Sequence, residues 1–248
     1  MLSGFYTAAS GMLLQQRTLN VLSNNMANVQ TPGFRVERVV STTFKEALVQ
    51  RTEGMNKQII GSATPVKIIE DVPSNFDPSS LENTGRPFDI AINGEGYFNI
   101  QVGEQQMLTR NGNFDMDEEG YLVLRGAGRV LGEDGPIQVE TSAFYVAPDG
   151  TIYDDENREI DKLLVTYPQE DAQLNKFING LYTIDNPELN APVEDATIMQ
   201  GTIEQSNIDL NREYTLVMEA QRAFQACSTA LRLVDEMNQK TASQIASI

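Results

Sequence analysis

Apolar residues recur every three or four positions near both ends of the chain. The N-terminal repeat runs through Leu2, Phe5, Ala9, Met12, Gln16, Leu19, Ser23 and Met26. The C-terminal repeat runs through Leu210, Glu213, Val217, Ala220, Phe224, Cys227, Leu231, Val234, Asn238, Thr241, Ile245 and Ile248. A repeat that averages about 3.5 residues over several heptads is typical of coiled coils. The pattern therefore predicts two long helices, over residues 2–29 and 206–248.

Both predicted helices carry more apolar surface than one pair of helices can bury. The C-terminal repeat is flanked by a second row, Leu216, Ala223, Ala230 and Met237. The N-terminal repeat is flanked by Ala8, Leu22 and Val29 on one side and by Tyr6, Leu13 and Ala27 on the other. Because two paired helices share only a narrow seam, either the middle of the chain or other copies of the protein must cover the rest.

The polar residues of the first helix are amides, and they include Asn24, Asn25 and Asn28, while Arg17 is its only charged residue. Amides can be buried among other helices without the cost of burying a charge. The helix should stop at a turn formed by Thr31, Pro32, Gly33 and Phe34, because proline disfavours helix in the preceding residue and glycine permits a turn.

The middle of the chain has a different texture. Residues 34–64 give a weak signal, which predicts an irregular connector with one or two helical turns over 44–49. From residue 65 to about 205, short β-branched and aromatic runs recur between turn signals: 66–69, 88–92, 97–100, 121–124, 144–146, 151–153 and 163–167. The turns carry Asn-Gly or Asp-Gly pairs at 93–96, 111–112, 134–135 and 149–150. A last strand over 197–205 leads to Ser206, which is predicted to cap the second helix with Asp209 three residues on.

These elements predict an α+β protein with a coiled-coil-like helical domain and a central antiparallel all-β domain. The helical domain would be discontinuous, joining residues 1–33 to 206–248, with the connector over 34–64 and the β domain over 65–205. We expect the self-assembly residues to be Leu2, Phe5, Ala9, Met12, Leu13, Leu19, Leu22, Asn24, Asn25, Met26, Asn28, Leu210, Leu216, Val217, Ala220, Phe224, Leu231, Val234 and Met237.

Composition narrows the possible functions. The 248 residues carry a net charge of −17, which argues against a nucleic acid or an anionic membrane surface as partner. Histidine is absent and there is one cysteine, so the commonest general base and any intrachain disulfide are missing. The run DMDEEG at 115–120 begins like a calcium loop, but Gly126 stands where the bidentate glutamate is required. We predict no enzyme activity, no cofactor and no metal.

Several segments closely resemble the bacterial flagellar rod and hook proteins. They are YTAASGM at 6–12, NNMANVQTPGF at 24–34, RPFDIAINGEGYF at 86–98, TRNGNF at 109–114, QSNID at 205–209 and AQRAF at 220–224. The length and the middle of the chain resemble the proximal-rod or distal-rod proteins, and the sequence leaves the choice between these open. Little is recognisable from residue 144 to 197.

The resemblance implies a structural subunit of the drive shaft that joins the motor to the hook. Such a subunit would assemble with copies of itself into a helical tube, beside neighbouring rod and hook proteins. It would be exported by the flagellar type III apparatus without a cleaved signal peptide. The absence of both a signal peptide and a run of about 20 apolar residues would otherwise place the protein in the cytoplasm. Alternatives are a non-polymeric protein with paired terminal helices, a β-domain hydrolase and another hook or basal-body component.

Overall fold

A computed structural model describes residues 2–44, 47–53, 56–63, 66–71, 79–141, 143–169, 174–177, 180–193 and 196–246. The chain forms two compact units. The first unit contains residues 1–27, 36–75 and 208–248, and the second contains 28–35 and 76–207. Residues 28–35 therefore belong with the β-rich part of the chain, although we expected most of them to complete the helical domain.

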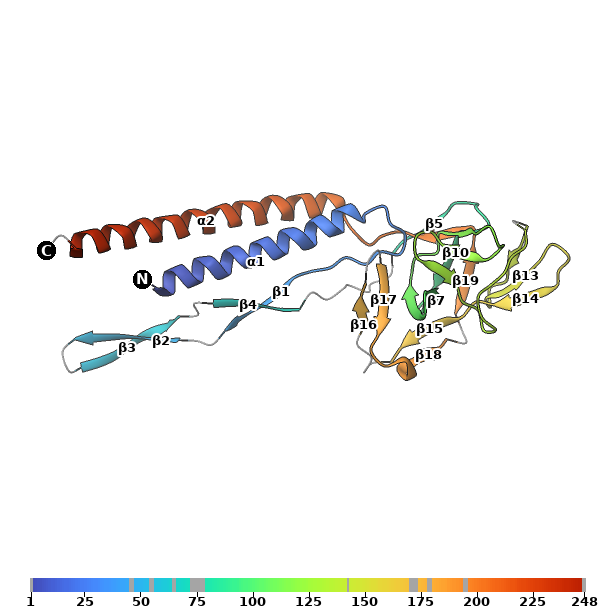
Figure 1. Ribbon diagram of the computed structural model, residues 1–248, viewed down its shortest axis with the longest axis horizontal. Helices are drawn as coiled ribbons and strands as arrows, with labels where there is room; N and C mark the ends of the chain where they lie inside the picture. Colours follow the sequence, from blue (N-terminus) through green and yellow to red (C-terminus); the bar gives the residue numbers. More distant parts are fainter. Residues whose placement is uncertain are drawn as a thin grey trace. The chain divides into compact units, whose positions relative to one another are not determined.

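The first unit holds two long helices and two strand pairs (Figure 1). The helices are α1 (Leu2–Ala27) and α2 (Leu210–Ala246). Strand β1 (Val40–Phe44) pairs antiparallel with β4 (Val66–Asp71), and β2 (Ala47–Glu53) pairs antiparallel with β3 (Asn56–Ala63). The α+β class with terminal helices and antiparallel strands is confirmed.

The strands between residues 40 and 63 differ from the predicted irregular connector. The predicted helical turns fall on strand residues at 44 and 47–49, whereas residues 45–46 lie outside the described residues. The partner of β1 lies more than twenty residues further along the chain, with Phe44 opposite Val66. A strand is stabilised by its cross-strand neighbours more than by its own sequence. Because the partner of β1 is distant in the sequence, residues 40–44 show no local hydrophobic pattern that would predict a strand.

The second helix begins after a cap that differs from the predicted one. The Asp209 carboxylate accepts hydrogen bonds from the backbone N–H groups of Asn211 (3.0 Å) and Arg212 (3.3 Å). This is the position and geometry of an N-cap residue, which satisfies amides that have no partner inside the helix. The predicted cap at Ser206 is therefore wrong, and the helix starts at Leu210.

The second unit is built from short strands joined in antiparallel pairs. Its strands are β5 (Leu81–Asn83), β6 (Ile90–Asn93), β7 (Tyr97–Val102), β8 (Gln105–Thr109), β9 (Phe114–Met116), β10 (Leu122–Leu124), β11 (Gly128–Val130), β12 (Tyr145–Val146), β13 (Thr151–Tyr153), β14 (Glu159–Lys162), β15 (Val165–Pro168), β16 (Leu174–Lys176), β17 (Leu181–Ile184), β18 (Asn190–Pro192), β19 (Thr197–Gln200) and β20 (Thr202–Glu204). A nine-stranded sheet runs in the order β16-β17-β8-β7-β11-β10-β9, and β15 joins β7 to β18. Every predicted run from 88 to 167 overlaps one of these strands.

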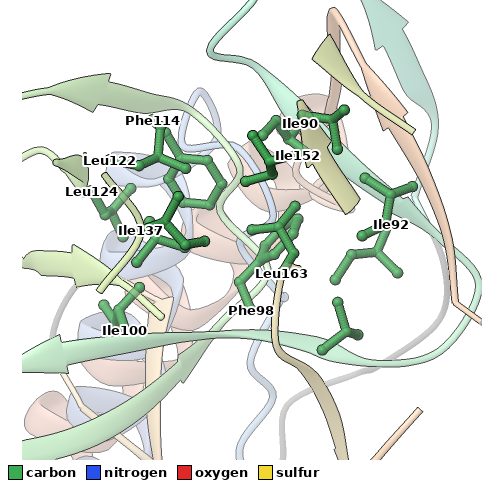
Figure 2. Packing of buried hydrophobic residues seen from close by; sticks show 14 of the residues in the cluster. Ile90, Ile92, Phe98, Ile100, Phe114, Leu122, Leu124, Ile137, Ile152 and Leu163 are labelled. Atoms are coloured by element: carbon green, nitrogen blue, oxygen red, sulfur yellow. The ribbon is translucent and has the colours of Figure 1, made fainter. Parts of the chain in front are cut away.

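The hydrophobic core of this unit lies among these strands (Figure 2). Alternation places Leu122 and Leu124 inside with Val123 between them only partly covered. The rings of Phe98 and Phe114 meet edge to face, with centroids 5.2 Å apart. Such geometry adds to the free energy gained by burying the two rings.

One predicted turn is a close backbone contact instead. At Asn111-Gly112, the Gly112 carbonyl accepts a hydrogen bond of 2.9 Å from the Ile90 amide. A Cβ at position 112 would lie 1.6 Å from the Ile90 carbonyl oxygen, so only glycine permits this approach. Glycine at position 112 is needed because the backbone of Ile90 lies so close. Gly150, between β12 and β13, instead has the positive φ of 92° that the hairpin signal predicted.

Candidate self-assembly surface

The two helices of the first unit lie side by side and antiparallel (Figure 1). The amide of Asn25 lies 3.2 Å from a carboxylate oxygen of Glu213, and a Cβ at Gly11 would lie 3.1 Å from the sulfur of Cys227. The two contacts are separated by two heptads on each helix, in opposite directions. At a rise of about 1.5 Å per residue, the two contacts lie roughly 21 Å apart along the helices, and together they fix the register of α1 on α2.

The face that α1 turns inward differs from the predicted stripe. Leu14, Val21, Leu22 and Asn25 are its buried residues, and each is at most 7% exposed. This face lies about two positions further along the helix than the predicted repeat through Met12. The described side chains of that repeat are half-buried or exposed. A Cβ at Gly11 would lie 3.1 Å from the Cys227 sulfur, so α1 meets α2 at a small residue that is not part of the predicted apolar repeat.

The inward face of α2, in contrast, follows the predicted repeat. Glu213 and Ala220 are buried, and Val217, Phe224, Cys227, Leu231 and Val234 are half-buried. The second apolar row of α2 is covered along only part of its length. Leu216 and Ala223 are half-buried, whereas Ala230 and Met237 are exposed.

A buried polar cluster joins three segments of the first unit. Glu213, fully buried, accepts hydrogen bonds from the Asn25 amide (3.2 Å) and from the Arg38 guanidinium (3.1 and 2.5 Å). Asn25 also donates to the Glu37 carbonyl (2.9 Å) and accepts from the Glu37 amide (3.1 Å). A buried carboxylate with such partners costs several kcal/mol if one partner is lost, so the cluster disfavours other registers of α1 on α2.

Large apolar side chains remain exposed on both helices. On α1 they are Phe5, Tyr6 and Leu13, and on α2 they are Leu210, Tyr214, Met218, Leu233 and Met237. Leu13 is 61% and Met237 59% exposed. Single exposed apolar residues are ordinary, but a gathering of this size on two helices is typical of an interaction surface.

A groove of about 450 Å³ opens between α1, α2 and residues 37–39. The buried residues Val21, Leu22 and Ala220 line it, and Glu219 is one of its polar lining residues. Gln15, Thr18, Glu37, Arg38, Val39, Leu216 and Ala223 complete the lining.

The predicted assembly residues are distributed over these faces. Leu22, Asn25 and Ala220 are buried, while Phe5, Leu13, Asn24, Leu210 and Met237 are exposed. The half-buried ones are Ala9, Met12, Leu19, Met26, Asn28, Leu216, Val217, Phe224, Leu231 and Val234. The side chain of Leu2 lies outside the described residues. Sequence reasoning missed Arg38, because an isolated arginine after the turn gives no periodic signal.

The turn after α1 is anchored inside the second unit. Gly33 has a φ of +67° and donates a hydrogen bond of 2.7 Å to the Glu204 carbonyl. A Cβ at Gly33 would lie 2.4 Å from the Arg110 carbonyl carbon, so the position requires glycine. Phe34 is buried under the ammonium of Lys176, which lies 3.8 Å from the ring centroid. Thr31 and Pro32 are half-buried.

A buried ion pair follows this turn. Arg35 lies 2.6 Å from one carboxylate oxygen of Glu204, and Arg110 lies 3.8 Å from the other. Burial lowers the pKa of Arg110, and the Glu204 carboxylate opposes that shift. Arg110 also donates to the carbonyls of Ile92 and Gly94. The cluster holds the residues after α1 against the strand that leads to α2.

The acidic turn that resembled a calcium loop is filled by arginines. Arg125 pairs with Asp115, and Arg129 pairs with Asp117 and Glu119. The hydrogen bond from Arg125 lowers the pKa of Asp115. Across the described part of the chain, no three His, Cys, Asp or Glu residues are grouped so that they could hold a metal ion. Within the same residues, no helix combines the length and hydrophobicity needed to cross a membrane.

Two terminal helices and a β-rich unit define the class of the protein as α+β, and comparison with known proteins gives its family. Residues 5–35 match the family "Flagella basal body rod protein", residues 91–154 the family "Flagellar hook protein FlgE/F/G D1 domain", and residues 199–245 the family "Flagellar basal body rod FlgEFG protein C-terminal". The chain belongs to the flagellar basal-body rod protein family.

Similar proteins align over nearly the whole length of the chain. The flagellar basal-body rod protein FlgG of Bacillus subtilis is 34% identical over 97% of this chain and 98% of its own length. The flagellar basal-body rod protein FlgF of Caulobacter vibrioides is 28% identical over 99% of both chains. FlgF of Rhizobium meliloti is 30% identical over 94% of this chain and 93% of its own length. The family consists of structural rod proteins, not enzymes.

Proposed function

We propose that this protein is a structural subunit of the flagellar rod that assembles with copies of itself into a helical tube and transmits torque from the motor to the hook. Family membership supports the rod role and a location in the flagellar basal body. The single observation that carries self-assembly is the exposure of large apolar residues on α1. Leu14, Val21 and Leu22 of this helix are buried within the chain, whereas Phe5, Tyr6 and Leu13 are exposed.

Charge supports the same proposal. The chain contains 35 acidic residues, yet α1 contains none of them. Copies that carry a net charge of −17 repel one another, and a contact surface without carboxylates reduces that repulsion where the copies meet. Contacts between different faces of identical subunits generate an open helical filament when the rotation does not close.

We propose the domain roles accordingly. Residues 1–33 with 206–248 would form the assembly part, in which the helices pack with coiled-coil-like seams between copies. The β-rich residues would lie outside the contact, and the acidic surface would keep the shaft soluble. Neighbouring rod and hook proteins would bind through the same helices. Export would proceed through the flagellar type III apparatus without a cleaved signal peptide.

Sedimentation and negative-stain imaging over a concentration series test self-assembly. The wild-type chain should form particles whose length grows with concentration. Replacing Leu13 by lysine should abolish this growth without unfolding the chain, since the side chain is exposed. Phe177→Lys, at an exposed residue of the second unit, is the matched control and should polymerise normally. If the two variants behave alike, the exposed apolar residues of α1 are not the assembly surface.

The alternative is a non-polymeric protein whose terminal helices pair with each other. The buried cluster of Asn25, Glu213 and Arg38 favours it, because this cluster stabilises helix pairing within one chain. A wild-type protein that stays monomeric at the highest concentration reached would support this alternative over the rod subunit.

A further inference from the structure

The groove of the first unit and the far part of α2 have complementary chemistry. On α2, Leu233, Met237 and Lys240 recur at four and three positions, so they share one helix face, here called the tail face. All three side chains are exposed. The nearby Glu236 lies 4.0 Å from Arg232, its partner one turn back, so Lys240 contributes the net positive charge of this face.

The groove offers apolar walls and a negative residue beside them. The half-buried Val39, Leu216 and Ala223 line it, and the exposed Glu219 carries a carboxylate at the same place. The neighbouring Arg38 is already paired with Glu213. The groove volume of about 450 Å³ exceeds that of a single side chain.

We propose that the tail face of one copy docks into the groove of a second copy, with Leu233 and Met237 between the helices and Lys240 against Glu219. This inference rests on the proposed rod function and names one contact between copies, in addition to the exposed apolar face of α1. The occupant is a second copy of this chain because a tail face cannot reach its own groove. Met237 and Glu219 are 18 positions apart on one straight helix, which is about 27 Å.

The contact is head-to-tail by construction. Donor and acceptor are different surfaces of the same chain, so each copy that donates a tail face still has an open groove. A chain of copies then grows without a built-in limit, which is the property that a filament subunit needs. A symmetric dimer would instead use one surface twice and stop at two copies.

Disulfide trapping tests the contact directly in the full-length chain. In a Cys227→Ser background, Glu219→Cys combined with Met237→Cys should give a ladder of trimers and larger species on oxidation. A bridge within one copy is excluded by the length of helix between the two positions. Each single-cysteine variant can form only dimers. The matched control is Glu156→Cys combined with Met237→Cys, which moves one cysteine to an exposed turn of the second unit. This control should give no ladder.

Charge reversal gives an independent measurement. Lys240→Glu should raise the concentration needed for polymerisation by about tenfold or more, because like charges then face each other across the contact. Adding Glu219→Lys should restore assembly, whereas adding Glu156→Lys, with the same net charge, should not. Polymers that form normally without a ladder and without rescue would overturn the docking contact and leave the rod function standing. A wild-type chain that never polymerises would overturn the rod function itself.

Discussion

The antiparallel register of α1 and α2 predicts that Gly11→Cys will form a disulfide with Cys227 inside one molecule. A Cβ placed on Gly11 lies 3.1 Å from the Cys227 sulfur. Across a disulfide, an S–S bond of about 2.04 Å holds each Cβ about 3 Å from the opposite sulfur. The new side chain therefore meets the distance that the bond requires.

The bridge should also stabilise the helical unit. The bridge closes a loop of roughly 35 residues if the second unit stays folded and of roughly 215 residues if it unfolds. The chain-entropy relation then predicts an increase of at most about 4 to 5 kcal/mol in the free energy of unfolding. Intact mass and free-thiol counts detect the bond, since Cys227 is the chain's only natural cysteine. Urea unfolding followed by helix signal, with and without reductant, measures the gain.

The matched control is Gly4→Cys, seven residues earlier on the same helix. A Cβ there meets no atom within 4 Å, and it is displaced by about 10 Å along α1, which is beyond the reach of a disulfide. This variant should stay reduced or form dimers between molecules. If Gly4→Cys closes on Cys227 as readily as Gly11→Cys does, or if neither closes, the register described above is wrong.

Three further predictions concern single positions. Glu213→Ala should lower the free energy of unfolding of the helical unit by about 2 to 4 kcal/mol, because Arg38 and Asn25 lose their buried partner; a loss below about 0.5 kcal/mol in urea unfolding would contradict this. Gly33→Ala should destabilise the second unit by about 2 to 5 kcal/mol through positive φ and overlap with backbone, whereas unchanged thermal unfolding would count against it. The backbone N–H of Arg158 lowers the pKa of Asp154 below its unfolded value of about 3.9. The stabilisation is therefore present above that pH and lost as pH falls through the folded pKa, so Asp154→Asn should show a weaker fall of melting temperature between pH 5 and about pH 2 than the wild type. Parallel curves for the two proteins would refute it.

The helices could be predicted because their signal is local and repeats many times. Even so, the heptads identify the inward face of α2 and miss that of α1. In α1 the contact with Cys227 of α2 is made at Gly11, which a search for apolar residues passes over. Small residues allow close approach, but a hydrophobic pattern gives them no weight.

What could not be predicted depends on partners distant in sequence. Strand β1 exists because β4 lies beside it, and Arg35 is buried because Glu204 meets it from the other end of the β unit. The cap at Asp209 was missed for a different reason. Ser206 and Asp209 are both good capping residues, and only the backbone geometry decides which of them ends the extended segment.

The anchored turn after α1 has a mechanical consequence. The Gly33 amide bonds to the Glu204 carbonyl, and the Asn207 amide bonds to the Phe34 carbonyl. The two segments that lead to the long helices are thus clamped to each other before either one leaves the β-rich unit. A pull applied to one helix is shared with the other through this clamp. Tension on either helix would therefore act on these hydrogen bonds and on the Arg35–Glu204 pair together.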